Sequence, residues 1–222
     1  MSEESVPSAP TAYPARLEVD YTVERNRVTT AFRIVLVIPI AIVYDVLTAG
    51  ATTTTTTTVA DETVKTVSTT SGGIVAGLFL ATLLMILFRQ VYPRWWFDFA
   101  RELTRFATRI GAYFVLLTDE YPSTIDEQKV HLDIDYPIVE RDLNRWLPLV
   151  KWFLAIPHYI VLFFLAVAAF FVVIVAWFAI LFTGRYPLGM FAFVVGVGRW
   201  ALRVNAYAFL LVTDRYPPFS LN

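Results

Sequence analysis

Apolar residues gather in long runs along this chain, and the longest run exceeds the length of an ordinary membrane helix. Residues 149–182 contain one charged side chain, that of Lys151. A single helix over these 34 residues would be about 51 Å long, whereas the hydrocarbon core of a bilayer is roughly 30 Å thick. We therefore expect two spanning helices, at 145–165 and 167–182, joined by a tight turn near Ala166.

Two further apolar runs precede this one. They cover residues 28–47 and 73–91, and a threonine-rich segment, 48–72, separates them. Pro39 lies in the first run as Pro157 lies in the third, and a proline inside a membrane helix usually kinks it. The four runs predict a membrane all-α fold with four spans in two helical hairpins.

A periodicity of three and four residues follows each pair of apolar runs. Between residues 95 and 114 the charged positions recur at this spacing and aromatic residues fill the remainder; the charged positions are Asp98, Arg101, Glu102, Arg105 and Arg109. This amphipathic pattern favours a helix at the membrane interface. Residues 189–212 repeat the pattern in a more apolar form, so we expect two such interfacial helices.

Strict alternation of apolar and charged residues marks two short segments, 17–24 and 132–136. A period of two indicates a half-buried strand. Because an open strand edge is not tolerated in lipid, we expect these segments outside the bilayer. There they would form a small cytoplasmic strand pair, antiparallel, in which each strand covers the other's exposed edge.

The chain also repeats itself in order, which predicts an internal duplication. The matching pieces are Leu17-Glu18-Val19-Asp20-Tyr21 with Leu132-Asp133-Ile134-Asp135-Tyr136, Val23-Glu24-Arg25-Asn26 with Val139-Glu140-Arg141-Asp142, Tyr92-Pro93 with Tyr186-Pro187, and Thr118-Asp119-Glu120-Tyr121-Pro122 with Thr213-Asp214-Arg215-Tyr216-Pro217. We divide the chain into a disordered cytoplasmic tail (1–12), a first membrane repeat (13–122) with an extracytoplasmic insertion (48–72), a linker (123–131) and a second membrane repeat (132–222).

Composition and charge narrow the functional classes. The chain is 57% hydrophobic and has no cysteine, which excludes disulfides and thiolate-bound metals, and its net charge of −1 does not suggest a nucleic-acid partner. Of its 18 Lys and Arg residues, all but Lys65 lie outside 48–72. Since cytoplasmic flanks of membrane helices are enriched in basic residues, we expect a multi-pass protein of the cell membrane with both termini in the cytoplasm.

The recurring arginines are the leading site candidates. Arg105 and Arg109 share a helix face with Tyr113, and Arg199 and Arg203 share one with Tyr207. Their guanidinium groups can bind anionic lipid headgroups bidentately. They can also form ion pairs with Asp119 and Asp214 of the two Thr-Asp-x-Tyr-Pro motifs, or with Glu102, since buried or interfacial charges are normally paired. The two interpretations are compatible.

Two other polar residues fall within apolar runs, Asp45 and His158. Either can mark an intramembrane functional site, although Asp45 lies near the outer end of its helix and His158 can be a hydrogen-bonded structural residue. The side chains of His131, Asp133 and Asp135 share one strand face and spread over about 13 Å along it, so they cannot bind one metal ion without ligands from elsewhere. We predict no metal and no cofactor, and find no catalytic constellation.

The second half carries specific motifs: Leu149-Val150-Lys151-Trp152-Phe153-Leu154-Ala155-Ile156-Pro157-His158-Tyr159, Arg185-Tyr186-Pro187, Arg199-Trp200, and Thr213 to Phe219. In these the chain resembles the uncharacterised, actinobacterial-type membrane family known as domain of unknown function 4389. The resemblance extends over about residues 13–219 and implies an integral membrane protein, with no known activity, substrate or catalytic residue.

These patterns favour a non-enzymatic membrane scaffold or accessory subunit, which would bind lipid headgroups and a partner protein or a second copy of itself. The alternative is a small transporter or channel with a path between the two repeats. Such a path would need polar side chains, and the apolar runs offer few, chiefly Asp45, Thr82 and His158.

Overall fold

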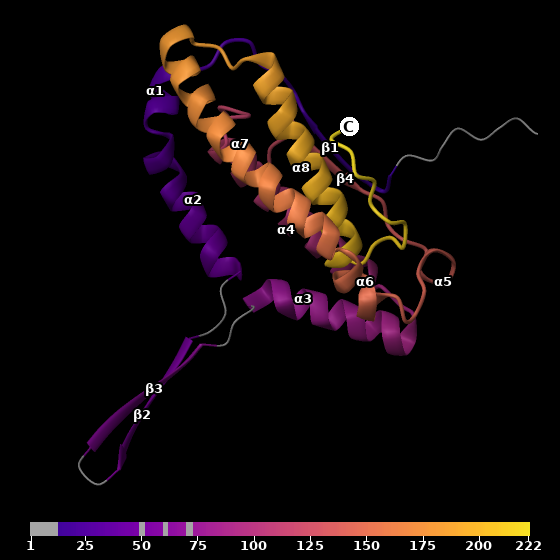
Figure 1. The fold of residues 1–222 in the computed structure, drawn as a ribbon. Helices are drawn as coiled ribbons and strands as arrows, with labels where there is room; N and C mark the ends of the chain where they lie inside the picture. Colours follow the sequence, from indigo (N-terminus) through magenta and orange to yellow (C-terminus); the bar gives the residue numbers. More distant parts are fainter. Residues whose placement is uncertain (1–12, 49–51, 60–61, 70–72) are drawn as a thin grey trace, which may run out of the picture.

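The computed structural model describes residues 13–48, 52–59, 62–69 and 73–222, so the predicted tail lies outside the described residues. The described chain is mostly helical, with two small antiparallel strand pairs (Figure 1). The elements in order are β1 (Ala15–Val19), α1 (Arg27–Ala31), α2 (Arg33–Thr48), β2 (Thr52–Val59), β3 (Glu62–Thr69), α3 (Gly73–Leu84), the π-helical turn η1 (Met85–Arg89), α4 (Arg94–Phe114), β4 (Val130–Ile134), α5 (Val139–Asp142), α6 (Pro148–Leu154), α7 (Ile156–Thr183) and α8 (Leu188–Ala208).

The elements form three layers. The strand pair β1–β4 packs on α8 and α4, and these two helices are covered on their other sides by α7 and α2 respectively. Figure 1 shows α7 and α8 side by side and antiparallel, with α2 apart from them and α3 set at a steep angle to α2. The core lies between the strands and the helix layer.

The predicted strand pairing is confirmed. β1 and β4 are antiparallel, and Leu17 lies opposite Leu132 at the centre of the register. Both leucines are buried against the helices, whereas the alternate residues Arg16, Glu18 and Asp133 are exposed. The alternation seen in the sequence is therefore the division between a core face and a polar outer face.

The predicted turn near Ala166 is wrong, because α7 runs without interruption from Ile156 to Thr183. No glycine or proline occurs between His158 and Thr183, and the helix ends at Gly184, which has a left-handed φ of 72°. The break lies earlier, at Ala155, so that Pro157 occupies the first turn of α7, where its missing N–H costs no hydrogen bond. The two predicted spans of the second half are one helix.

This continuity also corrects the predicted orientation. Arg145 precedes α6 and Arg185 follows α7, so these two basic residues flank opposite ends of the same helical rod. At 1.5 Å per residue the 28 residues of α7 alone are about 42 Å long. If this segment crossed a membrane, Arg145 and Arg185 would therefore lie on opposite sides of it, and not on the same side as the charge pattern predicted.

In the first half the helix expected at 28–47 is divided at Phe32 into α1 and α2, and Pro39 lies inside α2. The helices predicted at 95–114 and 189–212 are observed as α4 and α8, and their placement at a membrane interface stays a prediction. The threonine-rich segment contains a hairpin, β2–β3, which the sequence analysis did not predict. Among the helices of the described ranges, α7 is the one long and apolar enough, by length and composition, to cross a membrane.

Candidate functional site

Arg105 and Arg199 hold the strand pair against the helices. Arg105 donates from Nη2 to the carbonyl oxygen of Leu132 at 3.2 Å and pairs with Glu102 at 2.8 Å. Arg199 donates from Nε to the carbonyl oxygen of Leu17 at 2.8 Å. Each arginine thus binds the strand that comes from the other half of the chain. The two acceptor residues, Leu17 and Leu132, lie opposite each other in the strand pair.

Arg109 and Arg203 lie one turn further along and are buried. Arg109 donates to the carbonyl oxygen of Ser123 at 2.5 Å, and Arg203 donates to that of Ser220 at 3.0 Å. Both therefore fasten the segment that follows a Thr-Asp-x-Tyr-Pro motif. Protein carbonyls therefore occupy part of the guanidinium donors that the lipid-headgroup interpretation would direct at phosphate.

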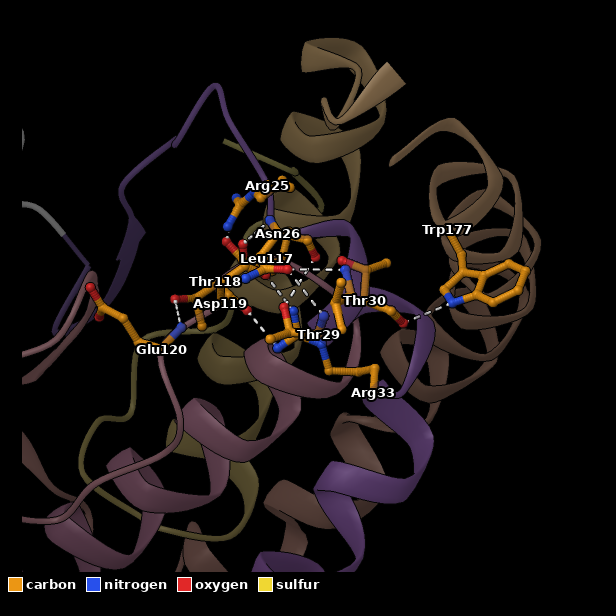
Figure 2. Close-up of polar contacts among 11 residues, drawn as sticks. Arg25, Asn26, Thr29, Thr30, Arg33, Leu117, Thr118, Asp119, Glu120 and Trp177 are labelled. Carbon is orange, nitrogen blue, oxygen red and sulfur yellow. Dashed lines mark hydrogen bonds and ion pairs between the residues drawn. The ribbon is translucent and has the colours of Figure 1, made fainter. Parts of the chain in front are cut away.

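The ion pairs expected between these four arginines and Asp119 or Asp214 are replaced by others. Asp119 pairs with Arg33, whose Nη1 also donates to the carbonyl oxygen of Thr118 at 3.1 Å (Figure 2). Asp214 lies 2.7 Å from Lys151 Nζ, which also donates to the carbonyl oxygen of Thr213 at 2.7 Å. In both places a buried helical cation binds the Thr-Asp turn, Arg33 from the first residue of α2 and Lys151 from the last turn of α6.

The rings predicted beside the arginines complete these two clusters. The Arg33 guanidinium lies 3.9 Å from the ring centre of Tyr113, and Lys151 Nζ lies 5.2 Å from that of Tyr207. A cation over an aromatic face gains electrostatic energy, particularly when both are shielded from water. Arg33 and Lys151 were the residues that the sequence analysis missed as ion-pair partners, although each stands six residues before the proline of its apolar run.

The two Thr-Asp turns, at Asp119 and at Asp214, also share other contacts. The backbone N–H groups of Asn26 and Asn144 donate to Asp119 and Asp214, the former at 3.0 Å. Leu116 and Leu211 precede the turns with left-handed φ values of 68° and 57°, an unfavourable conformation for leucine that the surrounding contacts maintain.

Figure 2 shows how Arg25 extends the first cluster. Its Nη2 donates to the carbonyl oxygen of Leu117 at 2.7 Å, and its backbone N–H donates to the carbonyl oxygen of Gly184 at 2.9 Å. Burial lowers the pKa of the Arg25 guanidinium, an effect that nearby Asp119 opposes. In the same view Trp177 of α7 donates to the carbonyl oxygen of Thr30 at 3.0 Å, which joins α7 to α1.

Two tyrosines cross between the halves. Tyr21 donates to the carbonyl oxygen of Tyr186 at 2.6 Å, and Tyr136 donates to that of Tyr92 at 2.5 Å. Burial raises the pKa of both Tyr92 and Tyr186 to about 12. The loops before α4 and α8 are therefore each held by a tyrosine hydrogen bond from the other half of the chain.

His158 and Asp45 occupy different environments. His158 is fully buried, its Nδ1 accepts a hydrogen bond from Trp200 Nε1 at 3.0 Å, and its ring stacks on Phe219 at 4.0 Å. The acceptor role of Nδ1 assigns the proton of a neutral ring to Nε2. These contacts favour the structural interpretation of His158. Asp45 is exposed near the end of α2.

Pairs of oppositely charged or hydrogen-bonding side chains lie on the outer face of the strands. His131 lies 3.3 Å from Asp20, and Asp135 lies 2.9 Å from Arg16. Over the described ranges, no three His, Cys, Asp or Glu side chains gather where they can hold a metal ion.

The sequence analysis also missed a cavity of about 480 Å³ between α4 and α8. Leu17 and Val19 of β1 border it on one side, and Tyr44 of α2 and Leu78 of α3 border it on another. Most of its lining is apolar. A volume of this size falls within the range of ligand pockets, about 300–1,000 Å³.

Comparison with known proteins adds one finding. No curated protein and no solved structure matches this chain significantly. A family match does exist, and it covers α6, α7, α8 and the C-terminal Thr-Asp turn, the part that carries the motifs quoted above. Residues 146–220 match the family described as Domain of unknown function (DUF4389), and over this segment the resemblance predicted from the sequence is confirmed.

Proposed function

We propose that the protein is a non-enzymatic membrane component that lies in a bilayer by one apolar face and presents a polar face to water. The observation that carries this proposal is the surface of α7. Its outward side chains are large, apolar and exposed, among them Phe164 (66%), Phe171 (60%) and Phe178 (49%). An apolar surface of this extent in contact with water is unfavourable, and such patches mark membrane or protein contacts.

Neighbouring helices extend the same face. Ile34, Ile42 and Val46 of α2 and Phe88 of η1 are exposed, as are Trp152 and Phe153 of α6. Tryptophan at the edge of an apolar surface is typical of the headgroup level of a bilayer. Two layers away, the outer face of β1–β4 carries exposed charged residues.

This distribution favours insertion by one face over upright spanning. If α7 stood upright in the bilayer, α8 beside it and the strand pair on α8 would occupy the same depth. The charged outer face of the strands would then lie in hydrocarbon, where ionised side chains and open strand edges are strongly disfavoured. A tilted or in-plane α7 keeps these groups in water.

We also infer that the chain arose by internal duplication. The matched turns, with Arg33–Asp119 and Lys151–Asp214, and the crossed tyrosine bonds support this inference. Its polar strand face, built from both halves, offers a surface for a partner protein. A channel receives little support, because the cavity between α4 and α8 is lined mainly by apolar side chains.

Depth measurement tests the proposal. The chain has no cysteine, so a nitroxide can be attached at a single cysteine replacing Phe164, Phe171 or Phe178, which lie seven residues apart on the exposed face. In phosphatidylcholine vesicles we expect all three labels in the hydrocarbon region at similar depths. An upright helix would instead spread them over about 21 Å.

A label at Glu18→Cys on the strand face supplies the aqueous reference. It should be accessible to a water-soluble relaxation agent, whereas the α7 labels should be accessible to oxygen. Water exposure at all three α7 positions would reject membrane insertion altogether. A depth difference between Phe164 and Phe178 that approaches the ~21 Å of an upright helix would restore the spanning arrangement.

A further inference from the structure

The cavity between α4 and α8 has equivalent walls. Its lining residues on the two helices include pairs that stand 94 positions apart in the sequence. These pairs are Thr104 with Gly198, Ala107 with Ala201, and Gly111 with Asn205. The two helices thus turn matching faces toward each other, and between these faces lies an open volume of about 480 Å³.

Several hydroxyl groups of the cavity lining already form hydrogen bonds within the protein. Thr104 donates its hydroxyl hydrogen to the carbonyl oxygen of Ala100 at 2.7 Å, and Thr108 donates to that of Thr104 at 2.8 Å. Thr82 accepts a hydrogen bond from Trp96 Nε1 at 2.9 Å. Since these hydroxyls are already bonded within the protein, the lining offers water few polar partners besides the Asn205 amide, and most of its surface is apolar.

The cavity borders on the apolar face. Tyr44 of α2, and Val75, Leu78 and Phe79 of α3, form its boundary away from the strands, and α7 contributes no residue to the lining. These boundary helices are the ones whose other sides expose apolar side chains. The apolar lining at α2 and α3 therefore adjoins helices that also expose apolar side chains on the outside of the protein.

We propose that an acyl chain of a bilayer phospholipid occupies this cavity and lies between α4 and α8. The inference rests on the proposed insertion of the α2 and α7 face into a bilayer. The chain fills a volume that packed side chains leave empty, and it gains the dispersion contacts that an empty cavity would forfeit. The protein then holds a lipid by its chain, while the repeated arginines stay bound to protein carbonyls.

Gly111 provides the means to close the cavity. A Cβ added at this position meets no other atom within 4 Å, so Gly111→Leu introduces its side chain at the cavity wall without a clash at the Cβ. Gly77 on α3 is a matched control, because it too has open space around it, is exposed and does not line the cavity. Both glycines are helical, so leucine improves helix propensity at each.

The experiment uses the full chain in phosphatidylcholine vesicles that contain a phosphatidylcholine with a diazirine in its acyl chain. After illumination, mass spectrometry locates the crosslinks. We expect them on the outward face of α7 and also on the cavity walls, at residues 104–111 and 198–205. Gly111→Leu should reduce the wall crosslinks at least about fivefold, whereas Gly77→Leu should leave them unchanged.

Failure of the cavity and failure of membrane insertion give different results. Crosslinks on α7 without crosslinks on the walls, or wall crosslinks that persist in Gly111→Leu, overturn the lipid site and leave insertion intact. Absence of crosslinks from α7 as well overturns the proposed function. If Gly111→Leu fails to fold, judged by its helical circular dichroism, Ala201→Leu closes the cavity from α8 and is scored in the same way.

Discussion

Two aligned segments of this chain take different forms. Residues 33–48 and 73–89 form α2 and the α3–η1 helix, which are separate and set at a steep angle (Figure 1). Their counterparts, 151–166 and 167–183, are contiguous and form the end of α6 and all of α7. The comparison shows that the 24 residues at 49–72 interrupt what is one helix in the second half. The apparent lack of a loop near Ala166 indicates an unbroken helix, and not a tight turn.

What both halves keep is the attachment of that helix. Arg33 begins α2 and Lys151 lies in α6, and each binds a Thr-Asp turn through a carboxylate and a carbonyl oxygen. The insertion leaves this end untouched. We conclude that the buried cation attaches this end of the helical segment to the Thr-Asp turn, while the length of the segment beyond it is free to differ.

The largest expected effect comes from removing these cations. Lys151 has no exposed surface and Arg33 is 2% exposed, so Lys151→Ala or Arg33→Ala leaves a carboxylate facing an apolar gap. Loss of one partner of a buried pair costs about 3–5 kcal/mol of unfolding free energy. Denaturant unfolding in detergent, followed by tryptophan fluorescence, measures it.

Lys129→Ala is the matched control for that prediction. Lys129 pairs with Glu120 at 3.6 Å and both side chains are well exposed, so its loss should cost about 0–1 kcal/mol. If Lys151→Ala were no more destabilising than Lys129→Ala, the attachment would not be the feature that both halves require.

A pH effect should be shared equally by the halves. The pKa of Tyr92 and of Tyr186 is raised to about 12 by burial, from an unfolded value of about 10. The raised values mean that each tyrosine stabilises the fold below pH ~10 and that this contribution is lost as the pH rises toward 12. The loss can reach about 3 kcal/mol for each residue.

Tyrosinate absorbance and thermal unfolding at alkaline pH measure this effect. Tyr92→Phe and Tyr186→Phe should each remove one late-titrating group and reduce the alkaline loss of stability by a similar amount. A large inequality between the two variants would show that the loops before α4 and α8 are not equivalent.

His158 breaks the equivalence, because the first half has Ile40 in its place. His158→Ile therefore gives the second half the residue of the first, and it deprives Trp200 Nε1 of its acceptor. An unsatisfied buried donor costs about 1–3 kcal/mol. His131→Ile, on the exposed strand face, should cost less than about 1 kcal/mol. Equal stability of His158→Ile and the unaltered protein would contradict a structural role for this histidine.

The smallest effect concerns the crossed tyrosine bonds. Tyr21→Phe and Tyr136→Phe each remove one hydrogen bond to a carbonyl oxygen of the opposite half and keep the ring. Each should cost about 0.5–1.5 kcal/mol, and the double variant should show the sum. Tyr121→Phe, at a half-exposed position, serves as the control and should change the unfolding free energy little.

The sequence by itself determined the local elements. Alternation at 17–24 and 132–136 predicted strands with one buried face, which are observed at Ala15–Val19 and Val130–Ile134, and the three- and four-residue spacing around Arg105 predicted α4. These patterns depend on where a residue's immediate neighbours point, which the chain encodes directly. Even the pairing of β1 with β4 followed, since two strands with exposed edges gain by covering each other.

Tertiary structure alone decided the partners and the continuity of the helices. Arg105 and Arg199 proved to bind strand carbonyls, Asp119 and Asp214 proved to bind Arg33 and Lys151, and α7 proved to pass through Ala166 without a turn. The cavity between α4 and α8 likewise depends on how far apart two packed helices stand. Nearby residues do not encode these features, because an ion pair or a cavity is chosen by whichever groups the whole fold brings within a few ångströms of each other.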